Sequence, residues 1–182
     1  MSADILTSNF FELFCLPVSF DVDLNQVQQR YMELQKQVHP DKFANASDQE
    51  KRLSIQQTSW LNEAQATLKD PVLRAGYLLK LKGIDFSMEN STTMDAAFLM
   101  QQLEIRERLE NISSEPESLD ALDALAKETR ANMDEVMRGF AESYEADRLD
   151  ESREWVRKLQ FMQKAIKEIN TLTAKIEDEL MG

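Results

Sequence analysis

The sequence is poor in residues that make covalent or metal cross-links. Its 182 residues include one cysteine and one histidine. A single cysteine cannot form a disulfide within the chain, which is typical of proteins in a reducing compartment. A structural zinc site usually needs four cysteine or histidine ligands, so we expect no bound metal and no cofactor. Cys15 lies in a short apolar segment, and we interpret it as a core residue.

Long apolar runs and clusters of cations are also missing. No apolar run is long enough to predict a membrane span. The segment 1–9 has no lysine or arginine, unlike a signal or transit peptide, and a bacterial cytoplasm is the simplest location. Residues 1–84 carry 9 Lys+Arg against 10 Asp+Glu, whereas residues 85–182 carry 12 against 23. The acidic second half argues against nucleic acid or anionic lipid as a partner, and the asymmetry indicates two functional units.

Glycine and proline are scarce, with four of each, and this scarcity favours long helices. We therefore predict an all-α protein. Asp23 is a candidate N-cap, Ser47 and Glu50 have the spacing of a capping box, and Pro71 suits a first helical turn. Helices are expected at about 9–16, 24–38, from 47 through 68, 71–83, 94–112, 116–144 and 147–180.

Periodic apolar residues predict how these helices pack. In the first half the stripes are Leu24, Val27, Tyr31, Leu34, Val38 and then Leu53, Gln57, Trp60, Ala64, Leu68. In the second half they are Leu119, Leu122, Ala126, Thr129, Met133, Val136, Phe140 and Trp155, Leu159, Met162, Ile166, Ile169, Thr173, Ile176, Leu180. Such seven-residue repeats predict antiparallel helices in a C-terminal three-helix bundle over 94–182. Residues 84–93 are polar and lack periodicity, so we predict a linker after an N-terminal domain at 1–83.

The tripeptide His39-Pro40-Asp41 interrupts the pattern between two predicted helices. Pro40 fixes its own φ angle and disfavours the helical conformation for His39. The sequence therefore predicts a stiff turn that displays an imidazole beside a carboxylate. A plain helix-ending turn with an exposed histidine is the alternative, because such tripeptides also arise by chance.

The helix at 94–112 has apolar residues on two sides. Phe98, Ile105, Leu109 and Ile112 fall on one side, whereas Leu99, Met100 and Leu103 fall on roughly the other. A bundle helix needs only one apolar face, so the second must pack on another domain or on a partner. Phe161 also lies off its own helical stripe. Either Phe161 and the second face bury each other or pack on the first domain, or they form a partner site with a charged rim.

The first half resembles a J-domain. The likeness rests on the segments Asn9–Phe14, Tyr31 through His39-Pro40-Asp41-Lys42-Phe43, Leu61–Ala64 and Leu68. The resemblance implies that the second helix and the loop dock on a DnaK-type chaperone and stimulate its ATP hydrolysis. It further implies that Arg30, Lys36 and Lys42 pair with an acidic partner surface and that Asp41 meets a partner arginine. His39 and Pro40 would set the shape of the loop. The second helix departs from many J-domains in being rich in glutamine and poorer in cations.

Nearly the whole chain is similar to the HscB family of iron–sulfur co-chaperones. The likeness rests on Leu73–Leu79 with Gly83, on Phe98–Glu107 and on Arg157–Phe161. It implies that the C-terminal bundle binds an IscU-like scaffold protein and delivers it to an HscA-like chaperone. The matching scaffold-binding positions are Leu99, Met100, Leu103, Glu104, Arg106, Glu107 and Phe161. Because iron–sulfur clusters usually need four thiolates, Cys15 is not expected to be a cluster ligand.

Two other classes of function stay open at this point. An enzyme could use His39 and Asp41 as an acid–base pair, but there is no Gly-rich phosphate loop and no activated nucleophile. A structural helical-bundle protein could carry the His-Pro-Asp turn incidentally and self-associate through the face of Leu99, Met100 and Leu103. A J-domain adaptor for a different client is a third alternative.

Overall fold

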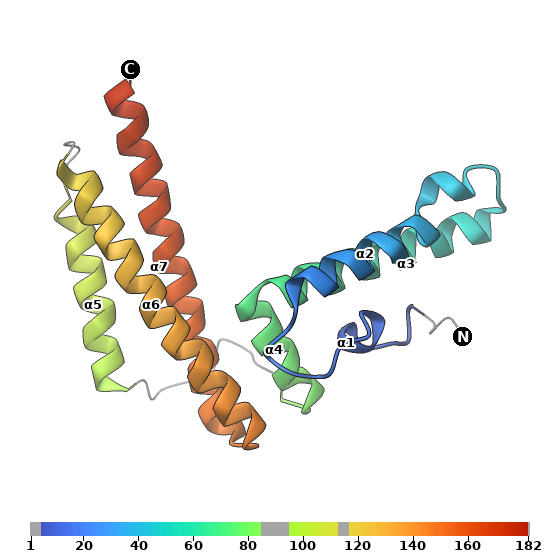
Figure 1. Cartoon of the computed structure of the whole chain (residues 1–182), viewed down its shortest axis with the longest axis horizontal. Helices are drawn as coiled ribbons and strands as arrows, with labels where there is room; N and C mark the ends of the chain where they lie inside the picture. Colours follow the sequence, from blue (N-terminus) through green and yellow to red (C-terminus); the bar gives the residue numbers. More distant parts are fainter. Residues whose placement is uncertain (1–4, 85–94, 113–116, 182) are drawn as a thin grey trace. The chain divides into compact units, whose positions relative to one another are not determined.

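The computed structural model describes residues 5–84, 95–112 and 117–181, and all regular structure among them is helical (Figure 1). The chain divides into two compact units, Met1–Gly83 and Ile84–Gly182. The first contains α1 (Phe10–Leu13), α2 (Leu24–Val38), the 3-10 helix η1 (Pro40–Phe43), α3 (Asp48–Lys69) and α4 (Pro71–Leu81). The second contains α5 (Ala96–Glu110), α6 (Glu117–Glu145) and α7 (Leu149–Met181). The prediction of an all-α protein is confirmed.

The first unit is built on an antiparallel hairpin of α2 and α3, with η1 at its tip (Figure 1). The Tyr31 hydroxyl donates to Asn62 Oδ1 at 2.8 Å, and the side-chain amide of Gln65 donates to Gln28 at 3.0 Å. The predicted caps are present, since the side chain of Asp23 accepts from the first turn of α2 and Ser47 forms a capping box with Glu50. The hydroxyl and the backbone N–H of Ser47 lower the pKa of Glu50 by bonding its carboxylate.

Aromatic rings join α1 and α4 to the base of this hairpin. The Phe10 ring stacks on Tyr77 with centroids 4.3 Å apart and meets the edge of Trp60 at 5.0 Å. The Tyr77 hydroxyl accepts the backbone N–H of Phe10 at 3.0 Å. Burial raises the pKa of Tyr77. The side chain of Arg74 is also buried, where it donates to the Leu68 carbonyl and lies over the Phe20 ring.

Three details of the first unit differ from the sequence predictions. The first helix ends at Leu13 rather than near Leu16, and Cys15 has a φ of 55°. Cys15 is consequently exposed, so its interpretation as a core residue was wrong. Leu53 is 44 % exposed and Leu24 is 46 % exposed, although both were placed on apolar stripes. Ala64 and Leu68 of the predicted α3 stripe are buried, and the other buried positions of α3 are Ser54 and Leu61.

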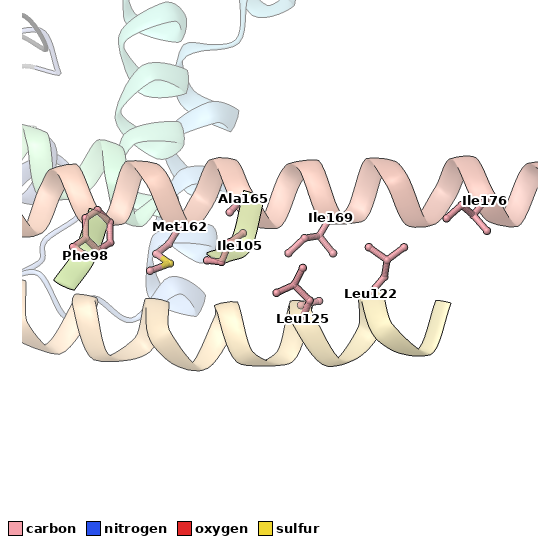
Figure 2. Close-up of a cluster of buried hydrophobic side chains, with 9 residues drawn as sticks. Phe98, Ile105, Leu122, Leu125, Met162, Ala165, Ile169 and Ile176 are labelled. Atoms are coloured by element: carbon pink, nitrogen blue, oxygen red, sulfur yellow. The ribbon is translucent and has the colours of Figure 1, made fainter. Parts of the chain in front are cut away.

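The second unit buries its apolar residues between α6 and α7, which run in opposite directions (Figure 1). Figure 2 shows Leu122 and Leu125 of α6 pointing toward α7, from which Met162 and Ile169 point back. Phe98 and Ile105 of α5 belong to the same buried cluster. Of the predicted α7 stripe, Leu159, Met162, Ile169 and Ile176 are buried, whereas Leu180 is 46 % exposed. Val156 and Ala165 are also buried, although both lie outside that predicted stripe. Met94, Pro116 and most of the predicted linker 84–93 lie outside the described residues.

Candidate functional site

The His-Pro-Asp tripeptide forms the corner at the tip of the α2–α3 hairpin. His39 is the C-cap of α2 with φ −58° and ψ 129°, and Pro40 opens η1. This extended ψ ends the helix at the residue before a proline, as the steric conflict with the proline ring requires. The side chains of His39 and Asp41 are 45 % and 89 % exposed. The corner thus displays both groups on a backbone that Pro40 stiffens.

The imidazole of His39 is held against the backbone of Asp41. The Asp41 N–H donates to His39 Nδ1 at 3.3 Å, and Asp41 Oδ2 lies 3.5 Å from the same nitrogen. The first contact needs Nδ1 without a proton, whereas an ion pair needs it protonated. In the neutral ring, the backbone contact places the remaining proton on Nε2. That N–H makes no hydrogen bond within the described residues and is available as a donor to another protein.

Two hydroxyl groups of α3 fix the position of this corner. In a continuing helix, the carbonyl of Val38 would accept the N–H of Lys42, but that N–H donates to the His39 carbonyl at 3.0 Å. The Val38 carbonyl accepts instead from Ser54 Oγ at 2.6 Å and from Thr58 Oγ1 at 3.2 Å. Ser54 is buried, so these bonds satisfy an acceptor that would otherwise lie unpaired inside the hairpin.

We predict that Ser54→Ala lowers the free energy of unfolding by about 1 kcal/mol, because a buried acceptor loses one of its two donors. The exchange protection of the Lys42 amide should fall as well, since the corner loses an anchor. Urea denaturation and amide hydrogen exchange measure the two effects. Ser59→Ala is the matched control, because Ser59 is an exposed serine of the same helix. Equal unfolding curves for the two variants would contradict the assigned role of Ser54.

The cations predicted to bind the chaperone differ in how available they are to another protein. Lys36 and Lys42 are exposed, and neither forms an ion pair with any described residue. Arg30 is less available, because its guanidinium pairs with Glu33 at 3.0 Å and its side chain is 35 % exposed. Arg30 also lies about 13 Å along the helix axis from His39, given the rise of a helix per residue. The structure therefore brings Lys36 and Lys42 closer to the tripeptide than Arg30.

The second predicted face of α5 is exposed. Leu99, Met100 and Leu103 are 43 %, 69 % and 55 % exposed, whereas Phe98 and Ile105 are buried against α7 and α6. The packing of α5 in its own unit thus uses only one of its two apolar sides. Three neighbouring exposed apolar side chains on one helix are typical of a surface that binds another protein.

A small hollow beside this face brings together several predicted residues from α5 and α7. It measures about 240 Å³ and is lined by Leu99, Gln102, Leu103, Arg106 and Phe161. Phe161 is half-buried and meets the edge of the Phe98 ring at 5.6 Å between centroids. Phe161 therefore supports the exposed face without burying it, and the idea that the two bury each other was wrong. Met100, Glu104 and Glu107 line a larger groove on the other side of Leu103.

Sequence reasoning missed Ser54 and Thr58, whose role depends on a contact between two helices. The only local signal is a serine at a position where the apolar stripe of α3 should continue. No group of three or more metal-ligating side chains occurs in the described ranges 5–84, 95–112 and 117–181. Within these ranges, every helix is too short or too polar to cross a bilayer.

The His-Pro-Asp corner on a helical hairpin, joined to a helical unit with an exposed face, defines a J-domain co-chaperone. The chain belongs to the HscB family of co-chaperones. The co-chaperone protein HscB homolog of Shewanella halifaxensis is 46% identical over 176 residues, which cover 94% of each chain. The family model described as HSCB C-terminal oligomerisation domain matches residues 94–170.

Solved structures share the fold over almost the whole chain. Chaperone HscB from Vibrio cholerae is 33% identical with a TM-score of 0.82, covering 93% of this chain and 99% of that one. Human co-chaperone protein HscB is 30% identical with a TM-score of 0.83, covering 91% of this chain and 82% of that one. Both the J-domain and the C-terminal helical unit of this chain therefore have counterparts in experimentally solved relatives.

Proposed function

We propose that the chain is an adaptor between an HscA-like chaperone of the DnaK type and an IscU-like scaffold protein during iron–sulfur cluster maturation in the bacterial cytoplasm. The domain at 1–83 stimulates the ATPase of the chaperone, and the domain at 94–182 binds the scaffold. Residues 84–93 link them. The co-chaperone names of its relatives support this role, and the lone cysteine suits a reducing compartment.

The exposure of Leu99, Met100 and Leu103 carries the proposal. A helix that already buries Phe98 and Ile105 needs no further apolar side chains for its own packing. Each exposed apolar side chain that a partner covers contributes about 1.5–3 kcal/mol at most. Arg106, Glu104 and Glu107 surround these anchors and supply the polar rim that a reversible interface needs.

The first unit acts on the chaperone by shifting its conformational equilibrium. The corner at His39, Pro40 and Asp41, with Lys36 and Lys42 beside it, binds the hydrolysis-competent conformation better than the resting one. A hundredfold stimulation needs a preference of about 2.7 kcal/mol, which a few charge-assisted hydrogen bonds supply. Because the same chain holds the client, it also raises the effective concentration of client at the chaperone. The chain itself performs no chemistry.

The test is the rate of ATP hydrolysis by a purified HscA-like chaperone. The full chain should raise the rate, an IscU-like scaffold added with the chain should raise it further, and the chain alone should hydrolyse no ATP. A rate that the chain leaves unchanged would contradict the proposed stimulation. Turnover by the chain without any chaperone would favour an enzyme, and stable self-association through the α5 face would favour a structural protein.

A further inference from the structure

A groove of about 680 Å³ lies on the side of α5 away from Phe161. α5 forms one wall, Asn132, Glu135 and Val136 of α6 form another, and Trp155 and Lys158 of α7 complete the lining. In Figure 1, α5 and α6 are farther apart toward the N-terminal end of α5, where this groove lies. Side chains of three helices form this groove. Of these helices, only α5 contributes residues with a proposed role in client binding.

Buried apolar side chains and one cation, Lys158, belong to the lining of the groove. Phe98 and Val136 are buried, and the ring of Trp155 lies beneath Lys158 with its centroid 4.6 Å from Nζ. The Lys158 ammonium also lies 5.4 Å from the Phe98 centroid and 3.6 Å from Asp95 Oδ2. These contacts hold Lys158 in place, and its side chain is only 19 % exposed. Lys158 therefore neutralises Asp95 and does not reach out to a ligand.

The remaining charges of the groove are all negative. Glu104 and Glu107 stand one helical turn apart on α5, and Glu135 stands on α6 across the groove. None of these three carboxylates forms an ion pair with any described residue. Clustered carboxylates between apolar walls attract cations, because the low-dielectric walls focus their field. The rim continues into the exposed Met100 and Leu103, so the groove adjoins the client-binding face.

We propose that the groove binds a lysine or arginine side chain of the same scaffold client, with Glu135 as the contact that α6 contributes. This inference rests on the proposed function, because it adds a second wall to the proposed client surface. Charge complementarity favours a cationic client segment over a second copy of the C-terminal unit, since residues 85–182 carry 12 Lys+Arg against 23 Asp+Glu. The client segment would place an apolar group on Met100 and Leu103 and its cation between α5 and α6.

The test compares two charge reversals on α6 in the full-length chain. Glu135→Lys lies in the groove, whereas Asp134→Lys changes the net charge equally on an exposed neighbour outside it. Binding of an IscU-like scaffold is measured by titration calorimetry and by association rate at low and high salt. We expect Glu135→Lys to weaken binding about tenfold at low salt, mostly through slower association, and less at high salt. Asp134→Lys should bind within about twofold of the unmodified chain.

Each outcome decides the inference. Equal scaffold affinities of Glu135→Lys and Asp134→Lys would overturn the proposed role of the groove. The proposed function would stay intact, provided the unmodified chain binds the scaffold. Absence of binding by the unmodified chain would overturn both. Glu135→Gln guards against a folding defect, because it removes the charge without adding a cation and should weaken binding by about threefold. Melting curves that match the unmodified chain establish that all three variants are folded.

Discussion

His39→Gln is expected to reduce stimulation of the chaperone ATPase to the rate of the chaperone alone. The Asp41 N–H donates to Nδ1 of the imidazole, and this hydrogen bond orients the ring on its short, stiff side chain. Glutamine is longer and has an additional rotatable bond, so it neither fixes Asp41 nor presents a donor at the place of Nε2. Two ordinary hydrogen bonds contribute about 1–3 kcal/mol in total. A hundredfold stimulation corresponds to about 2.7 kcal/mol, so losing both bonds can remove all of it.

The fold should survive this change, because the His39 side chain is 45 % exposed and lies outside the aromatic core of the first unit. Steady-state ATP hydrolysis with increasing concentrations of the variant is the measurement. Asn45→Gln, a change at an exposed residue of the same connection, is the control and should stimulate normally. Scaffold binding by His39→Gln should also be normal. Stimulation within twofold of the unmodified chain would refute the role of the corner.

The combined variant Leu99→Ala, Met100→Ala and Leu103→Ala is expected to lose more than about 100-fold in scaffold affinity. Covering three such side chains contributes about 3–5 kcal/mol in total, after allowing for the surface each already buries on α5. The loss should appear mainly as faster dissociation, since apolar contacts form after the encounter. The thermal midpoint should change little, because alanine favours helices and the three residues are exposed.

A matched pair of apolar truncations controls for this triple change. Leu180→Ala with Met181→Ala removes exposed apolar groups from the end of α7, far along the chain from the α5 face. That variant should bind the scaffold normally. The triple variant should still stimulate the chaperone when no scaffold is present, since its J-domain is unchanged. Unfolding of the triple variant would instead indicate that the three residues belong to the core.

Local sequence predicted most of the helices for physical reasons that operate within a few residues. Asp23 and Ser47 accept N–H groups of the first turn, and Pro40 excludes a helical conformation for the residue before it. The prediction for Cys15 failed because the chain leaves the helix after Leu13 and turns through a positive φ. No residue type at that point signals such a turn. The apolar character of the segment therefore predicted a buried Cys15, whereas the backbone turn leaves this residue exposed.

The parts of the candidate site differ in how far the sequence alone predicts them. The two faces of α5 followed from periodicity, because a helix with apolar residues on both sides cannot bury both within a small bundle. The bonds from Ser54 and Thr58 to the Val38 carbonyl could not be predicted, since they join residues from two helices whose register is set by packing. The groove beside Glu135 is likewise a property of three helices together.

The sequence by itself determined the helices, the proline-stiffened corner and the surplus apolar face, because each arises from interactions within one segment. Only the tertiary structure decided which surplus side chains stay exposed and which acidic residues share a groove. It also decided that α3 supplies the hydroxyl groups that hold the corner. These features depend on distances between segments far apart in the chain. Such distances follow from how side chains pack, which no local pattern specifies.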